Sequence, residues 1–258
     1  MPQQQRMYSQ YGRGRQLLIA FHGYGMDGSQ FRVLEDSLLK KYNIIGFHLP
    51  YHKNGPANHE DWIDLVKAEI RKLVAQSEFE YFSLAGYSIG SKVTLHLIEE
   101  FQSQIDEIFL FAPYGLENHW GLSFVTKGIG NSFFRLMVNT SLPEKIMKVV
   151  KFLKIIDQSH HEIIHKELLS RNKRESLCKT LQMAGEIRIK RNQLPELINR
   201  NQIKSTIIYG KDDVLFPFKK RSISILEQFD MAYVDQIKEG HWLVTDKLDK
   251  ALANRTAL

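Results

Sequence analysis

The stretch that decides the fold is "LAGYSIG", residues 84–90. An apolar run typical of a short buried strand, residues 80–86, leads into it, and residues 91–101 after it have the pattern of a helix. Ser88 is therefore expected on a tight turn between a strand and a helix. The flanking glycines fit such a turn, and G-x-S-x-G in this setting is typical of a displayed serine nucleophile. The alternative interpretation is a plain turn serine.

Short apolar runs alternate with helical patterns on both sides of this turn. The runs of about five apolar residues predict strands, and the alternation predicts a mostly parallel sheet that is buried on both faces. The predicted strands are residues 17–21 (LLIAF), 43–50 (NIIGFHLP), 80–86 (EYFSLAG), 106–115 (DEIFLFAPYG), 204–210 (KSTIIYG) and 232–237 (AYVDQI).

Two segments between the first strands have helical spacing. Residues 29–42 are expected to form a helix that begins at a Ser29 cap. Residues 61–76 are expected to form an amphipathic helix. Its predicted apolar face consists of Trp62, Leu65, Val66, Ile70 and Leu73.

The strand rhythm stops between residues 115 and 200, where helices and loops are expected. We therefore expect a core of residues 1–114 and 201–258, with residues 115–200 inserted as a helical unit. The insertion holds 15 Lys and Arg against 8 Asp and Glu, within a chain of net charge +6. A solvated surface is the favoured interpretation, ahead of attraction of anionic or amphiphilic substrates and of contact with a membrane surface. No nucleic-acid motif accompanies the charge, so nucleic acid is not expected as a partner.

The bulk composition is that of a globular protein. Of its 258 residues, 43% are hydrophobic and 25% charged, and its single cysteine excludes an internal disulfide. No apolar run approaches the roughly 18 residues of a membrane span, and the polar N-terminus has no secretory core. We therefore expect a cytoplasmic protein, while the sequence says nothing about its oligomeric state.

A serine hydroxyl needs a base to accept its proton before it can act as a nucleophile. Downstream of Ser88, a predicted strand ends at Gly210 and is followed by Asp212 and Asp213. His241 follows the last predicted strand. Ligand chemistry in parallel sheets gathers at the carboxyl ends of the strands, so these side chains are candidates for one site.

The same chemistry needs donors for a developing oxyanion. The backbone N–H groups of Tyr24, after the first predicted strand, and of Ile89, at the start of a helix, are the candidates. His22 is expected to hold the loop that carries Tyr24. The side chains of Tyr24, Tyr87 and Tyr114 are expected either to touch substrate or simply to pack.

In these motifs the sequence resembles the α/β-hydrolase superfamily. The resemblance covers residues 17–114 and 203–245. It rests on "HGYG" (22–25), "GYSIG" (86–90), "GKDDVLFP" (210–217) and "EGHW" (239–242), which follow the order of the family. It implies an α/β fold with helices on both faces of a mostly parallel sheet and a helical cap at the insertion. Only residues 1–16 precede the first parallel strand, which leaves little room for the antiparallel edge strands of the family.

The resemblance also implies roles for individual residues. Ser88 is the nucleophile, His241 the general base, and Asp213 the carboxylate that orients the imidazole. Asp213 is preferred to Asp212 because the family places its acid three residues after the glycine that ends the strand.

The expected reaction is hydrolysis of a small-molecule carboxylic ester or thioester through an acyl-enzyme on Ser88. The expected mechanism needs neither a metal nor an organic cofactor. The alternative is a lyase or a small-molecule receptor on the same fold, because relatives of both kinds retain serine, aspartate and histidine.

A competing motif lies in the insertion. His161, Glu162 and His165 form H-E-x-x-H, which on a helix can bind zinc with the glutamate as base. Glu186 is a candidate third ligand. A metalloprotease would leave the four hydrolase motifs unexplained, so a polar stripe on a helix is the favoured interpretation.

Overall fold

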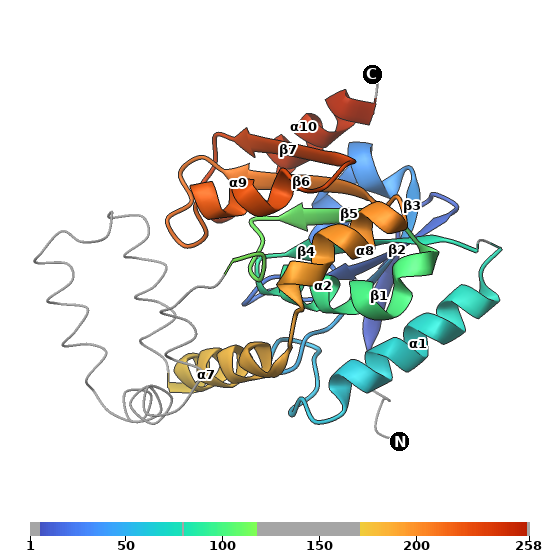
Figure 1. Ribbon diagram of the computed structural model, residues 1–258. Helices are drawn as coiled ribbons and strands as arrows, with labels where there is room; N and C mark the ends of the chain where they lie inside the picture. The colour runs from blue at the N-terminus through green and yellow to red at the C-terminus, as the bar shows by residue number, and fades with distance from the viewer. Residues whose placement is uncertain (1–5, 79, 118–170, 257–258) are drawn as a thin grey trace, which may run out of the picture. The chain divides into compact units, whose positions relative to one another are not determined.

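The computed structural model describes residues 6–78, 80–117 and 171–256 (Figure 1). The chain divides into two compact units, residues 1–117 with 187–258 and residues 118–186. Of the second unit the structure describes α7, Arg171–Glu186. The histidine motif at residues 161–165 lies outside the described residues, and so does most of the expected helical insertion. The domain boundaries set from the sequence stay a prediction.

The first unit is built on a seven-stranded sheet of order β1-β3-β2-β4-β5-β6-β7. β1 runs antiparallel to β3, and every other pairing is parallel, which confirms the mostly parallel sheet. The short β1 shows that the first residues do supply one antiparallel edge strand. The strands are β1 (Tyr8–Tyr11), β2 (Gln16–Phe21), β3 (Tyr42–Phe47), β4 (Phe82–Tyr87), β5 (Ile105–Phe111), β6 (Lys204–Gly210) and β7 (Ala232–Ile237).

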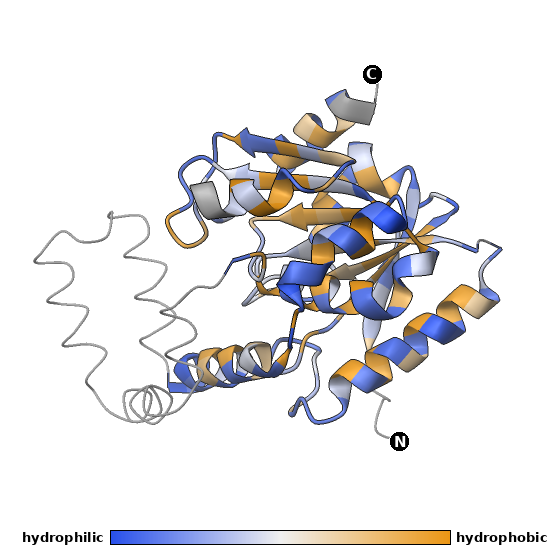
Figure 2. Cartoon of the chain, viewed as in Figure 1, coloured by the Kyte–Doolittle hydropathy of each residue, from blue (hydrophilic) through white to orange (hydrophobic). Residues whose placement is uncertain are grey.

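Helical elements cover both faces of the sheet. α2 packs on β2, β4 and β5, while α10 contacts β7 and the irregular turn η2. Figure 2 shows mostly apolar residues along β5, whereas β7 and the surface helices carry both polar and apolar residues. The helices are α1 (Trp62–Gln76), α2 (Ile89–Phe101), α8 (Leu194–Arg200), α9 (Lys220–Leu226) and α10 (Asp246–Thr256), with the short turns η1 (Gln30–Val33), η2 (Glu35–Leu39), η3 (Gln102–Gln104) and η4 (Arg191–Gln193). Among the described residues, none of the helices is both long enough and apolar enough to cross a membrane.

Alternating strand residues build the two halves of the core. In β2, Leu18 and Ala20 belong to the apolar cluster that includes residues of η1, η2 and α10. Phe21 points to the opposite face, where its ring meets Trp62 of α1. The inner strands β2, β3, β4, β5 and β6 are almost entirely buried, so they read as largely apolar runs in the sequence, whereas β7 at the sheet edge alternates and has no buried residue.

The prediction of a helix over residues 29–42 is wrong. The segment forms the 3-10 turn η1 and the π-type turn η2, and the Ser29 side chain makes no cap bond to η1. The Asp249 carboxylate accepts the backbone N–H groups of Asp36 and Ser37 at 2.9 and 2.8 Å, as well as the Ser37 hydroxyl. This contact with a residue distant in sequence fixes the backbone in a conformation that local spacing does not reveal.

The amphipathic helix expected over residues 61–76 is present as α1. Trp62, Val66 and Ile70 are buried, as its pattern predicts. Leu65, by contrast, is 55% exposed, so the apolar face is narrower than expected.

Two glycines allow backbone segments to meet behind the carboxyl edge of the sheet. A Cβ on Gly90 would lie 2.0 Å from the Phe21 carbonyl oxygen, so α2 and β2 are in backbone contact there. A Cβ on Gly210 would lie 2.4 Å from the Gly240 carbonyl oxygen. The start of α2 therefore lies against the end of β2, and the loop after β7 lies against the end of β6.

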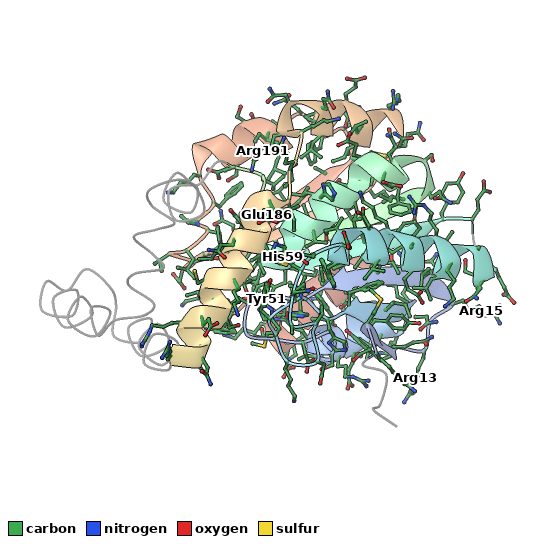
Figure 3. All side chains as sticks on the ribbon, turned by 90° about the horizontal axis from the view of Figure 1, so that it is seen from below. Arg13, Arg15, Tyr51, His59, Glu186 and Arg191 are labelled. Carbon is green, nitrogen blue, oxygen red and sulfur yellow. The ribbon has the colours of Figure 1, made fainter. Side chains whose placement is uncertain are left out.

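Loops at that edge are tied down by side chains. The Tyr51 hydroxyl lies 2.5 Å from Nδ1 of His59 in the loop after β3, and both residues are labelled in Figure 3. Arg191, labelled in the same view, donates from Nε to the Gly115 carbonyl at 2.6 Å. The segments on either side of the inserted unit thus lie next to each other within the first unit.

Candidate active site

Ser88 stands alone between β4 and α2, in an unusual backbone conformation. Its φ is 51° and its ψ is −117°. The backbone around it is held on both sides, since its N–H donates to the Phe111 carbonyl at 2.9 Å and its carbonyl accepts the N–H groups of Ser91 and Tyr114. The sharp turn expected from the glycine-flanked serine is therefore present.

The structure brings Ser88, His241 and Asp213 into one hydrogen-bonded chain. Ser88 Oγ lies 2.9 Å from His241 Nε2, and His241 Nδ1 lies 2.8 Å from Asp213 Oδ2. The side chain of Asp213 is fully buried, while that of His241 is 13% exposed. These three residues, separated by up to 153 positions, are the ones that the sequence motifs single out.

The Asp213 carboxylate is held ionised. Burial raises the pKa of this carboxyl, but the hydrogen bond and charge of His241, with the N–H groups of Phe216 and Leu215, outweigh it and hold the pKa below its ordinary value. Both of those N–H groups donate to Oδ1, at 2.9 and 2.8 Å. Because an ionised carboxylate can only accept, the His241 nitrogen that faces it, Nδ1, carries a proton, and in the neutral ring the lone pair is then on Nε2, facing Ser88.

Asp212, the second candidate acid, lies outside this chain of hydrogen bonds. Its backbone N–H donates to the Glu239 carbonyl at 3.0 Å, and the residue is exposed. The backbone bond of Asp212 helps to place the loop before His241, whereas the carboxylate that reaches the imidazole is that of Asp213.

The loop after β2 is fixed by His22 and Gln30. His22 Nε2 accepts the Leu49 N–H at 3.0 Å, so its proton is on Nδ1, which donates to the Gly23 carbonyl at 2.7 Å. The Gly23 N–H donates to Gln30 Oε1 at 2.9 Å. Complete burial, and then the neighbouring His52, lower the pKa of His22 to about 3, which keeps its ring neutral. This geometry fits the structural role expected for His22.

Tyr24 and Ile89, the expected oxyanion donors, lie on the two segments that meet at this edge. Ile89 is the first residue of α2, where a backbone N–H has no acceptor within its own helix. Tyr24 is in the turn after β2, one residue beyond Gly23. The close contact of Gly90 with β2 joins the two segments. Their role as donors stays a prediction.

Aromatic rings surround the imidazole. Phe216 and Tyr87 lie 5.4 and 5.5 Å from the His241 ring, and Tyr114 lies 5.4 Å from Phe216. Sequence reasoning missed Phe216, although its position three residues after Asp213 is a usable signal. Gln30 was also missed, because nothing in its surroundings marks it as a partner of the Gly23 backbone.

No group of three or more metal-binding side chains occurs among the described residues. The H-E-x-x-H motif at residues 161–165 lies outside them, and its zinc interpretation stays a hypothesis. Glu186, its candidate third ligand, is the last residue of α7.

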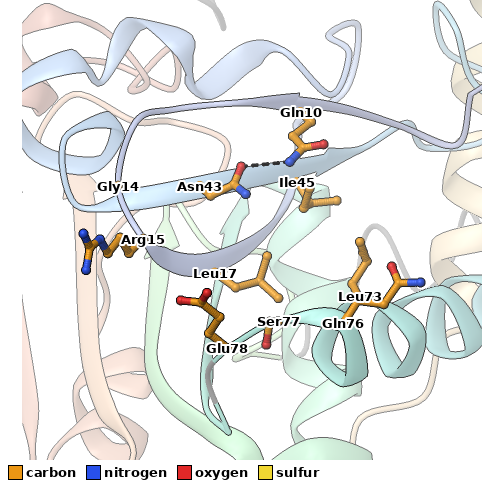
Figure 4. Close-up of a pocket in the computed structure, with 10 residues that line it drawn as sticks. All are labelled: Gln10, Gly14, Arg15, Leu17, Asn43, Ile45, Leu73, Gln76, Ser77 and Glu78. Carbon is orange, nitrogen blue, oxygen red and sulfur yellow. Dashed lines mark hydrogen bonds between the residues drawn. The ribbon is translucent and has the colours of Figure 1, made fainter.

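A cavity of about 660 Å³ opens at the opposite edge of the sheet (Figure 4). Its lining includes Leu17 and Asn43, near the starts of β2 and β3, and Gln76 at the end of α1. Gln10 Nε2 donates to Asn43 Oδ1 at 3.2 Å across one wall. Because Ser88 follows the carboxyl end of β4, this cavity is separate from the triad.

No protein-family model and no curated protein matches the chain. Solved structures do match it across almost its whole length. A thermophilic esterase from Thermogutta terrifontis is 13% identical, with a TM-score of 0.66 and coverage of 97% of this chain and 91% of that one. The α/β hydrolase MGS-M2 from a Medee basin deep-sea metagenome library is 11% identical, with a TM-score of 0.67 and coverage of 97% and 94%.

A third match has a related chemistry in its name. The thioesterase domain from the curacin biosynthetic pathway is 14% identical, with a TM-score of 0.57 and coverage of 96% of this chain and 94% of that one. At these identities the matches show the fold alone. The chain has the α/β-hydrolase fold.

Proposed function

We propose that the protein is a serine hydrolase that cleaves a carboxylic ester or thioester of a small molecule. The observation that carries the proposal is the hydrogen-bonded chain from Ser88 through His241 to Asp213. Esterases and a thioesterase domain among the structural neighbours support hydrolysis as the general activity.

The first half-reaction forms the acyl-enzyme. His241 Nε2 takes the proton of Ser88 as Oγ attacks the carbonyl carbon of the substrate, and Asp213 stabilises the imidazolium that results. The carbonyl electrons move to oxygen, and in this proposal the N–H groups of Tyr24 and Ile89 stabilise that oxyanion. The tetrahedral intermediate then collapses as His241 returns the proton to the leaving oxygen or sulfur, which departs with its bonding electrons.

The second half-reaction repeats these steps with water. His241 takes a proton from a water molecule, whose oxygen attacks the acyl carbon and forms a second tetrahedral intermediate. Collapse releases the carboxylic acid, and Ser88 regains its proton from His241. No step requires an external oxidant or reductant.

Fluorophosphonate labelling together with p-nitrophenyl ester hydrolysis tests the proposal. We expect the wild-type protein to be labelled and to hydrolyse esters, and Ser88→Ala to lose the label and about 10⁶-fold in kcat. Ser103→Ala, which changes an exposed serine in η3, is the matched control and should behave as wild type.

Two results would redirect the proposal. Labelling that persists in Ser88→Ala would place the nucleophile elsewhere. Labelling at Ser88 with no turnover across a panel of esters and thioesters would favour the lyase or receptor alternative.

A further inference from the structure

Tyr87, the residue before the candidate nucleophile, contacts the loop that carries the base. It is the last residue of β4 and is 1% exposed. Its hydroxyl donates to the backbone carbonyl of His241 at 2.6 Å, and its ring lies 5.5 Å from the imidazole at an interplanar angle of 30°. Tyr87 therefore holds both the backbone and the ring of a residue 154 positions away.

The same ring also contacts the loop after β2. A Cβ on Gly23 would lie 2.4 Å from both Cδ1 and Cε1 of Tyr87, so the ring fills the space beside that glycine. Gly23 precedes Tyr24, the proposed oxyanion donor. One side chain thus lies against the segments that carry the base and the oxyanion donor, and its backbone is continuous with the nucleophile.

The Tyr87 hydroxyl holds its proton more firmly than a phenol in water does. Burial, and then the charge of Asp213, raise the pKa of the Tyr87 phenol far above its ordinary value. The imidazole of His241 is already bound to Asp213 through Nδ1, so the bond from Tyr87 restrains the other end of that residue, its main chain. Two restraints on one residue fix its distance to Ser88 better than one.

From this geometry we infer that Tyr87 is a positioning residue, which sets the place of His241 relative to Ser88 and supports the Gly23 loop. The inference rests on the proposed function. It assigns Tyr87 no contact with the reacting atoms. It also explains why this position carries a tyrosine rather than another large apolar residue, since only the hydroxyl reaches the carbonyl.

The test is Tyr87→Phe, which removes the hydroxyl and keeps the ring. Displacing a catalytic group by a fraction of its hydrogen-bond length costs on the order of 10- to 100-fold in rate, so kcat should fall by about that factor. KM should stay unchanged, because the ring remains in place. The rate of fluorophosphonate labelling should fall as well, because labelling, like the acylation step of turnover, needs His241 to take the proton of Ser88.

Tyr42→Phe is the matched control. Tyr42 is also fully buried, and its hydroxyl donates to Glu107 Oε2 at 3.3 Å near the start of β3, away from the triad. The free energy of unfolding of Tyr42→Phe in urea should fall about as much as that of Tyr87→Phe. Its kcat and labelling rate should stay those of the wild type. If Tyr87→Phe keeps kcat and labelling within about twofold of Tyr42→Phe, the inference is overturned.

Gly23→Ala provides a second variant that keeps the hydroxyl. Its methyl group forces the Tyr87 ring to move, so kcat and the labelling rate should fall when Gly23→Ala is made in the wild-type protein. When it is made in the Tyr87→Phe protein, which already lacks the hydrogen bond, both rates should fall by a smaller factor. Equal effects of Gly23→Ala in both backgrounds would contradict a shared role. A wild-type protein without hydrolysis or labelling would instead refute the proposed function, before any variant is compared.

Discussion

Because His22 is buried and neutral, we predict that the folded protein loses stability in acid. Its ring is 0% exposed and uses both nitrogens, toward Gly23 and Leu49, so protonation in the folded state would remove an acceptor and bury a charge. The pKa is lowered from 6.5 to about 3 in the folded protein. His22 is therefore protonated below pH 6.5 in the unfolded chain, whereas in the folded protein it stays neutral down to about pH 3.

The sign and size follow from this difference. The contribution of His22 to stability is complete above pH 6.5 and is lost as the pH falls toward the folded value. At about pH 5, some 1.5 units below the unfolded pKa, the loss relative to about pH 7.5 is about 2 kcal/mol.

Urea unfolding of the wild type and of His22→Asn, each at both pH values, measures the effect. Asparagine cannot titrate, and its hydrogen-bonding cost is the same at both pH values and cancels in the double difference. We expect the wild type to lose about 2 kcal/mol more than the variant on going to about pH 5. Equal losses in the two proteins would refute a His22 that stays neutral in the folded protein at about pH 5.

Three further predictions concern packing, a distant contact and metals. Gly90→Ala should lower the free energy of unfolding in urea by about 1–3 kcal/mol or more, because the added methyl group meets the Phe21 backbone. This cost should exceed the gain from the better helix propensity of alanine. An unchanged free energy would contradict the close approach of α2 and β2. Asp249→Ala should cost about 1–3 kcal/mol, since the N–H groups of Asp36 and Ser37 lose their acceptor, and faster hydrogen exchange at these two amides checks it. Ester hydrolysis should be unaffected by EDTA; loss of activity that zinc restores would revive the metal interpretation of residues 161–165.

The strands and the candidate triad could be predicted because their signals are local. Ser88 and Asp213 each follow a buried strand, β4 or β6, within three positions, and His241 follows the alternating edge strand β7 by four. The resemblance adds the choice of Asp213, which the sequence pattern "KDD" alone leaves open. The structure places this carboxylate, and not that of Asp212, beside His241.

The features that escaped prediction depend on residues far apart in sequence. Asp249 shapes the turn at Ser37 from 212 positions away, and no periodicity in residues 29–42 records that contact. Likewise, Tyr87 within "GYSIG" gives no sign that its hydroxyl is directed at His241. Local patterns find elements, whereas side chains that join loops become visible only when the sheet order is known.

The backbone angles of Ser88 have a consequence for evolution and engineering. An L-residue held at a φ of 51° and a ψ of −117° carries strain on the order of 1–3 kcal/mol, which glycine would largely escape. Ser88→Gly should therefore unfold at a higher temperature than Ser88→Ala, although neither can form an acyl-enzyme. On the proposed function, the more stable Ser88→Gly protein is an inactive one, so stability and turnover make opposite demands on this position.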